Sequence, residues 1–190
     1  MLILCCLAIV LVTFLGAVKA DREVNAVTNL IDAGEILSAL TLLETLKPLR
    51  PCDPDLLFVE ARVYEAAGET DRAIALYELL IDVFPNIPEP YNNAAALYAA
   101  RGAIYKAEQL LLGGLGTHNT YKMINENLSN LYIARAAEAY RKALNIETEP
   151  GSENIISPIL KLLDPVDSTH SDNSDISITS NECIKFIDNM

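Results

Sequence analysis

Between residues 20 and 147 the apolar positions recur three and four residues apart, and this helical pattern itself repeats every 34 residues. Each period predicts two amphipathic helices joined by a turn at a glycine. Positions that carry the period are Gly34, Gly68 and Gly102; Ala39, Ala73 and Ala107; Tyr64, Tyr98 and Tyr132; and Pro51 with Pro85. The pattern therefore predicts a row of helix-turn-helix units.

The second unit has the clearest helix signals. Its first helix is predicted over residues 55–67, with Asp53 as the N-cap and Pro54 in the first turn. Gly68 is expected to end that helix in the left-handed conformation, which glycine enters at low cost. Asp71 is then predicted to cap a second helix.

These units resemble tetratricopeptide repeats. The small and aromatic residues typical of that repeat fall at Ala61, Ala95, Tyr64, Tyr98, Ala73, Ala107 and Tyr77, while Leu57, Tyr91, Leu80 and Gly114 depart from it. The resemblance implies an all-α fold, a short α-solenoid of stacked helix pairs with repeats at about 20–53, 54–87 and 88–120. Alanines at the small positions would let paired helices approach closely.

The fourth unit lacks its glycine turn. Tyr132 precedes Ala136 by four positions, whereas the matching residues of the second unit, Tyr64 and Ala73, are nine positions apart. One continuous helix is therefore predicted over residues 121–146, within a fused segment 121–147 that projects past the last helix pair.

The glycines before this helix predict a break. Gly113 to Asn119 is expected to be a loosened helix end followed by a loop. The stretch from Pro88 to Ala143 resembles a group of periplasmic repeat proteins of proteobacteria. That resemblance implies no chemistry.

The N-terminal residues 1–18 are apolar and uncharged, which predicts either a signal peptide over residues 1–20 or a membrane anchor. Helical residues 1–18 would span about 27 Å, close to the hydrocarbon thickness of a bilayer. Lys19 and Arg22 follow the apolar stretch and no basic residue precedes it, which favours a cytoplasmic C-terminal domain. Both alternatives stay open, with an exported, periplasmic or membrane-anchored location expected.

The composition changes after Pro150. Residues 148–190 are rich in serine, aspartate, asparagine and threonine, and we expect an acidic, mostly disordered tail. Removal of residues 1–20 would leave Cys52 and Cys183, which are expected to be unrelated thiols.

Charge and residue chemistry narrow the function. The net charge is −12 and the pI about 4.5, which disfavours nucleic acid as a partner. The two histidines, His118 and His170, have no ligands at metal-binding spacing, and Glu60, Glu65, Glu69 and Asp71 are interpreted as surface charge. No catalytic residue, metal site or cofactor is therefore predicted.

The resemblance implies that the first helix of each pair lines a concave groove. The candidate binding residues are Phe58, Arg62, Glu65, Asn92, Asn93, Ala96, Ala99, Glu126, Asn127 and Asn130. Asparagine amides suit a groove that binds peptide backbone, because they donate and accept hydrogen bonds. The function predicted is a non-catalytic scaffold or adaptor for an envelope protein's peptide or helix. The alternative is an accessory subunit that self-associates or docks through residues 121–146.

Overall fold

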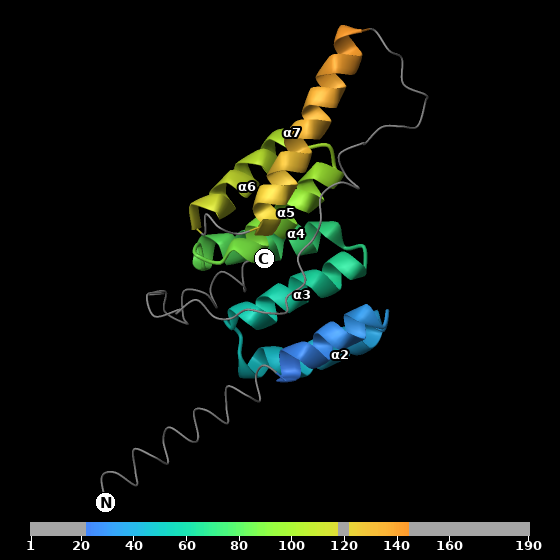
Figure 1. Cartoon of the computed structure of the whole chain (residues 1–190). Coiled ribbons are helices and arrows are strands. Elements are labelled where there is room, and N and C mark those ends of the chain that lie inside the picture. The colour runs from blue at the N-terminus through green and yellow to red at the C-terminus, as the bar shows by residue number, and fades with distance from the viewer. Residues whose placement is uncertain (1–21, 118–121, 145–190) are drawn as a thin grey trace, which may run out of the picture.

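The computed structural model describes residues 22–117 and 122–144, and all of their secondary structure is helical. Figure 1 shows the helices stacked in chain order from blue to orange. The first described helical segment covers residues 22–32. It is followed by α2 (Ile36–Leu46), a short 3-10 helix (Lys47–Leu49), α3 (Pro54–Ala66), α4 (Thr70–Val83), α5 (Pro88–Ala100), α6 (Ile104–Thr117) and α7 (Lys122–Ala143).

In each of the three described helix pairs, a glycine turn joins the first helix to the second. Gly34, Gly68 and Gly102 have φ angles of 74°, 77° and 78°, which confirms the left-handed conformation predicted for Gly68 and the turns predicted at the other two glycines. At the second turn, the backbone N–H of Gly68 donates to the carbonyl of Glu65 and the N–H of Glu69 to that of Tyr64, at 2.9 and 2.8 Å. Glycine is favoured here because these two bonds require a left-handed residue.

The start of α3 agrees with the sequence, whereas the start of α4 does not. Asp53 accepts hydrogen bonds from the backbone N–H groups of Asp55 and Leu56, at 3.0 and 3.1 Å. The helix α4 begins at Thr70, so Asp71 lies in its first turn and does not cap it. The Asp71 carboxylate instead pairs with Arg101 of the next turn, at 2.7 Å.

The core is divided between two clusters, and α3 contributes to both. Its residues Leu56, Val59 and Val63 pack with α2 and the first helical segment. Its other face packs with α4 and the later helices. Ala61, Ala73, Ala95 and Ala107 are fully buried, which agrees with the expected close approach of paired helices.

The predicted break at Gly113 is wrong for residues 113–117. The helix α6 continues through Thr117, whose hydroxyl donates to the carbonyl of Gly114 at 2.7 Å. A Cβ at Gly114 would lie 2.5 Å from Ile124 Cδ1 and 3.0 Å from Tyr91 Cβ. The glycine thus permits close packing of α5, α6 and α7, which offsets its low helix propensity.

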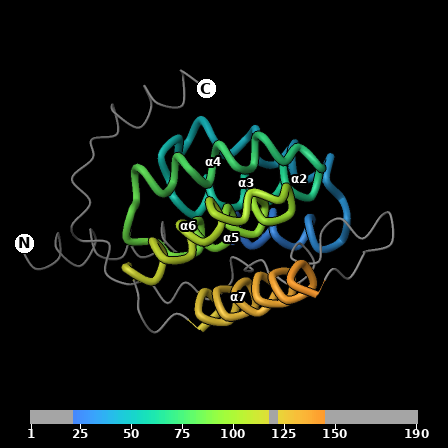
Figure 2. Tube along the Cα trace, turned by 90° about the horizontal axis from the view of Figure 1, so that it is seen from above, coloured from blue at the N-terminus to red at the C-terminus, as the bar shows by residue number. Residues whose placement is uncertain are grey.

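The last helix, α7, is uninterrupted, as the missing turn predicts. Its buried residues are Ile124, Asn127, Leu131 and Ala134, all in its first thirteen positions. The remainder extends beyond α5 and α6 in Figure 1, and Figure 2 shows α7 at the edge of the stack. Only part of α7 is therefore held by the described helices.

Two sequence predictions fall outside the described residues. They are the signal peptide or membrane anchor at residues 1–20 and the acidic tail at 148–190. Within residues 22–117 and 122–144, none of the helices combines the length and apolarity needed to cross a bilayer.

Candidate functional site

A chain of hydrogen bonds runs through the interior of the helical stack. The Asn127 amide in α7 donates to Asn92 Oδ1 in α5 at 2.7 Å, and the Asn92 amide donates to Asn93 Oδ1 at 3.2 Å. The Asn93 amide donates to the Tyr77 hydroxyl in α4 at 3.2 Å, which donates to Glu65 Oε2 in α3 at 3.1 Å. One polar chain thereby connects four helices from three repeat units.

Burial governs the ionisation of the two titratable groups in this polar chain. It raises the pKa of the Glu65 carboxyl from 4.5, against the hydrogen bond from Tyr77 and the positive charge of Arg62. Burial also raises the pKa of Tyr77 well above 10, and the nearby Glu65 charge adds to this effect. Tyr77 therefore keeps its proton at neutral pH and remains a hydrogen-bond donor.

The structure places most of the predicted groove residues inside the protein. Asn92, Asn93 and Asn127 are 0% exposed, so their amides are not presented to a peptide in this conformation. Phe58 is also buried, with its ring centroid 5.6 Å from that of Tyr77. The sequence pattern missed this burial because polar amides normally indicate an exposed face.

The other candidates divide in the same way. Ala96 and Ala99 are buried in α5. The half-buried candidates are Arg62, Glu65, Glu126 and Asn130, although the terminal nitrogen Nη1 of Arg62 is itself buried. These four residues are the accessible part of the predicted groove.

An ion pair that the sequence did not indicate joins the first and second units. Glu60, interpreted as surface charge, is buried and accepts a 2.6 Å hydrogen bond from Lys47. Burial alone would lower the pKa of Lys47, but the bond to Glu60 and its charge outweigh that effect and raise it from 10.5. The two residues lie in different units, so helical spacing alone gave no signal for the pair.

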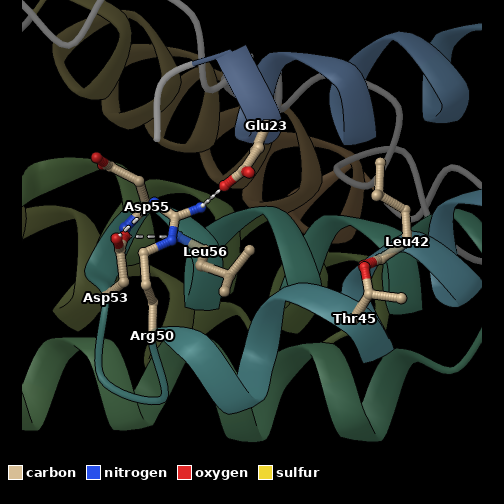
Figure 3. A network of polar contacts seen from close by, with 7 residues as sticks. All are labelled: Glu23, Leu42, Thr45, Arg50, Asp53, Asp55 and Leu56. Carbon is tan, nitrogen blue, oxygen red and sulfur yellow. Dashed lines mark hydrogen bonds and ion pairs between the residues drawn. The ribbon is translucent and has the colours of Figure 1, made fainter. Parts of the chain in front are cut away.

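Arg50 links the first helical segment to the start of α3, as Figure 3 shows. Its guanidinium lies 2.9 Å from Asp53 Oδ2 and 3.3 Å from Glu23 Oε2. Asp53 is also the N-cap of α3, so one carboxylate fixes both the helix start and the arginine. This arrangement positions the first helical segment against α3.

Cys52, in the connection before α3, is disulfide-bonded, so the expectation of an unrelated thiol at this position is wrong. The other three cysteines of the chain, Cys5, Cys6 and Cys183, lie outside the described residues.

The buried polar side chains described above hold the helices of the stack together. Among residues 22–117 and 122–144, no three His, Cys, Asp or Glu side chains come together in a way that could hold a metal ion. The buried amides and the Tyr77 hydroxyl bond to one another across helix boundaries. Their effect is to fix how the repeat units stack.

An apolar surface lies on the exposed side of α7. Ile133 is 63% exposed, Tyr140 71%, Leu144 56% and Tyr132 43%. Large apolar side chains gathered on one exposed helix indicate a surface for protein contact.

Comparison with known proteins supports the class that the fold defines. No family model matches the chain. It is similar to the TPR repeat-containing protein YpiA of Bacillus subtilis (strain 168), with 25% identity over 148 residues that cover 72% of this chain. Those residues make up 35% of the relative, so the chain spans about a third of its length. Helical pairs and this similarity together support a tetratricopeptide-like repeat protein.

Proposed function

We propose that this chain is an adaptor without catalytic activity, which binds a peptide or helix of an envelope protein. The observation that carries the proposal is the stack of helix pairs with tetratricopeptide-like turns and small residues. Stacked pairs of this kind present an extended face to a partner, and none of the buried polar side chains described above is needed to contact it.

The accessible part of the predicted groove defines where the partner would bind. Arg62 supplies a positive charge on α3, while Glu126 and Asn130 lie one turn apart on α7. A face that combines a cation, a carboxylate and an amide can bond both the backbone and the charged side chains of an extended peptide. Phe58 and the three buried asparagines then act as support for this face.

Two features favour an exported or membrane-anchored protein. Residues 1–18 are apolar, and Cys52 is disulfide-bonded. Disulfides persist mainly in oxidising compartments outside the cytosol. Sequencing the N-terminus of the protein purified from cells tests this part of the proposal, since a chain that begins at Asp21 has been cleaved and exported.

Partner capture tests the binding face. The variant carries Arg62→Ala, Glu126→Ala and Asn130→Ala, and the control carries Glu69→Ala, Arg72→Ala and Lys106→Ala, all at exposed positions of α4, its preceding turn and α6. We expect the first variant to lose at least tenfold in affinity for a purified envelope partner, and the control to retain wild-type affinity. Equal affinity of both variants and wild type rejects the groove.

A second candidate function is that of an accessory subunit whose contacts lie on α7. The observation that favours it is the exposure of Tyr132, Ile133 and Tyr140 on α7 and of Leu144 directly after it. Deletion of residues 136–147 would remove Tyr140 and Leu144 from this surface and leave α3 to α6 in place. An unchanged mass in solution after the deletion would argue against self-association.

A further inference from the structure

The helix α7 joins two segments that are separate helices in the other units. Its first half, residues 122–133, follows the pattern of α3 and α5, with Ser129 and Tyr132 in register with Ala95 and Tyr98. Its second half, residues 136–143, follows the pattern of α4. Both halves of a helix pair are therefore present, but the turn between them is absent.

The second unit shows how such halves pack when the turn is present. Ala73 and Tyr77 of α4 are fully buried, as is Ala61 of α3. Their counterparts in the second half of α7 are Ala136 and Tyr140, and both are exposed. Because one straight helix cannot fold onto itself, the second half of α7 cannot reach the first half of the same chain.

Five exposed residues form one stripe along α7, and Tyr132 among them also bonds to Glu108 of α6. Successive helical residues are about 100° apart, so positions spaced by three and four lie on one face. The stripe consists of Ser129, Tyr132, Ala136, Tyr140 and Ala143, all exposed, and it lies opposite the buried residues Ile124, Asn127, Leu131 and Ala134. Small residues alternate with tyrosines, as in the pairs that are closed within the chain.

We propose that a second copy of this chain covers the stripe. Two α7 helices would run antiparallel about a two-fold axis near Ala134, so that the second half of each lies on the first half of the other. Ala136 then faces Tyr132 of the partner's helix and Tyr140 faces its Ser129, as Ala73 and Tyr77 face α3 within one chain. The dimer therefore contains two copies of the helix pair that one chain alone cannot form. Exchange of an element between two copies is the expected result when the turn that joins it to its neighbour is lost.

This inference deepens the second candidate function and is independent of the groove. Both chains use the same surface in a two-fold contact, so no surface is left for a third chain. The product is therefore a dimer and not a filament. The two halves supply about 33 Å of paired helix, a small interface, so the dissociation constant should be in the micromolar range.

Restoring the turn gives the sharpest test. The variant carries Gly-Glu-Thr-Asp-Arg, the sequence of residues 68–72, inserted after Arg135 of the full chain. The insertion sets Tyr132 and Ala136 nine positions apart, as in the second unit. The two halves can then pair within one chain, and we expect a monomer with an unchanged helix content. A folded insertion variant that still dimerises as tightly as wild type overturns the proposal.

Two neighbouring alanines provide a matched pair of substitutions. Ala136→Glu places a carboxylate in the stripe, whereas Ala137→Glu places the same group about 100° around the helix, also at an exposed position. Sedimentation of the full chain between about 1 and 500 μM is expected to show a dimer for wild type and Ala137→Glu. Ala136→Glu should weaken association at least tenfold.

Other occupants of the stripe give different results. If residues 145–190 or an unrelated protein cover it, the purified full chain stays monomeric over this whole concentration range, and the proposal is wrong. A dimer that Ala136→Glu and Ala137→Glu weaken equally also overturns it, because the contact then lies elsewhere. Neither result affects the adaptor function, which partner capture tests separately.

Discussion

Asn127 of α7 donates a 2.7 Å hydrogen bond to Asn92 of α5, which lies 35 positions earlier in the chain. Both side chains are completely buried. A buried amide must keep its hydrogen-bond partners, so replacing one member leaves a desolvated polar atom on the other. We expect Asn127→Leu to lower the free energy of unfolding by about 1–3 kcal/mol.

Urea unfolding followed by circular dichroism measures this loss. Glu126→Ala is the control, because Glu126 precedes Asn127 but is half-buried and pairs with the exposed Lys122 one turn away. Such exposed pairs contribute about 0.3–0.5 kcal/mol. A loss for Asn127→Leu no greater than that for Glu126→Ala would show that the buried amides do not hold α7.

The second prediction separates the conformational role of a glycine from its size. An added Cβ would meet open space at both Gly68 and Gly116, but only Gly68 has a positive φ. Gly68→Ala should therefore destabilise the protein by about 1–2 kcal/mol. Gly116→Ala should stabilise it by about 0.5–1 kcal/mol, because Gly116 lies within helix α6.

Thermal unfolding of both glycine variants checks the sign of each effect. Gly68→Asn is a useful third variant, since asparagine tolerates the left-handed conformation better than alanine and should recover part of the loss. Destabilisation of the same size at Gly68 and Gly116 would contradict the assignment.

Local signals in the sequence predicted the helix pairs well. The glycine turns, the Asp53 cap and the uninterrupted α7 depend on neighbouring residues, so periodicity was enough to indicate them. The interior polar contacts depend on residues in different units. The sequence pattern wrongly placed these residues on an exposed groove. Asn92, Asn93 and Asn127 resembled an exposed polar face, and only their three-dimensional pairing shows that they are internal.

Gly114 illustrates the same limit. Helix propensity alone predicted a loosened end at this position, but the close approach of Ile124 and Tyr91 offsets that preference. In the tetratricopeptide pattern that the sequence resembles, Gly114 replaces an alanine, so the sequence already held a small residue at this close approach. A tertiary contact thus overrides a local preference.

The third prediction tests that contact with a double-mutant cycle. Gly114→Ala should destabilise the protein by about 1–3 kcal/mol, because the new Cβ would lie 2.5 Å from Ile124 Cδ1. Ile124→Val removes that methyl group and should cost about 0.5–1.5 kcal/mol in the wild-type protein. In the Gly114→Ala variant, Ile124→Val should lower the stability of the protein by less than this, or should raise it. Additive effects of the two substitutions would rule out the close contact.

The fourth prediction concerns the pH dependence of stability. Burial raises the pKa of Glu65 above its usual 4.5, so the folded state holds this proton more tightly than the unfolded state. The favourable contribution of Glu65 is therefore complete below pH 4.5 and is lost as the pH rises through the folded-state pKa. Its ionised form lowers the stability of the protein at neutral pH relative to the protonated form.

Glu65→Gln removes this ionisation and keeps an oxygen that can accept the hydrogen bond from Tyr77. We expect the variant to gain stability relative to wild type as the pH rises from about 4 to 7. Urea unfolding across that range measures the difference, with Glu126→Gln as the control for removing one negative charge from an acidic chain. If the stability gained by Glu65→Gln over wild type equals that gained by Glu126→Gln at every pH, burial does not oppose the ionisation of Glu65. The polar chain from Glu65 to Asn127 would then be more open to water than its hydrogen bonds indicate.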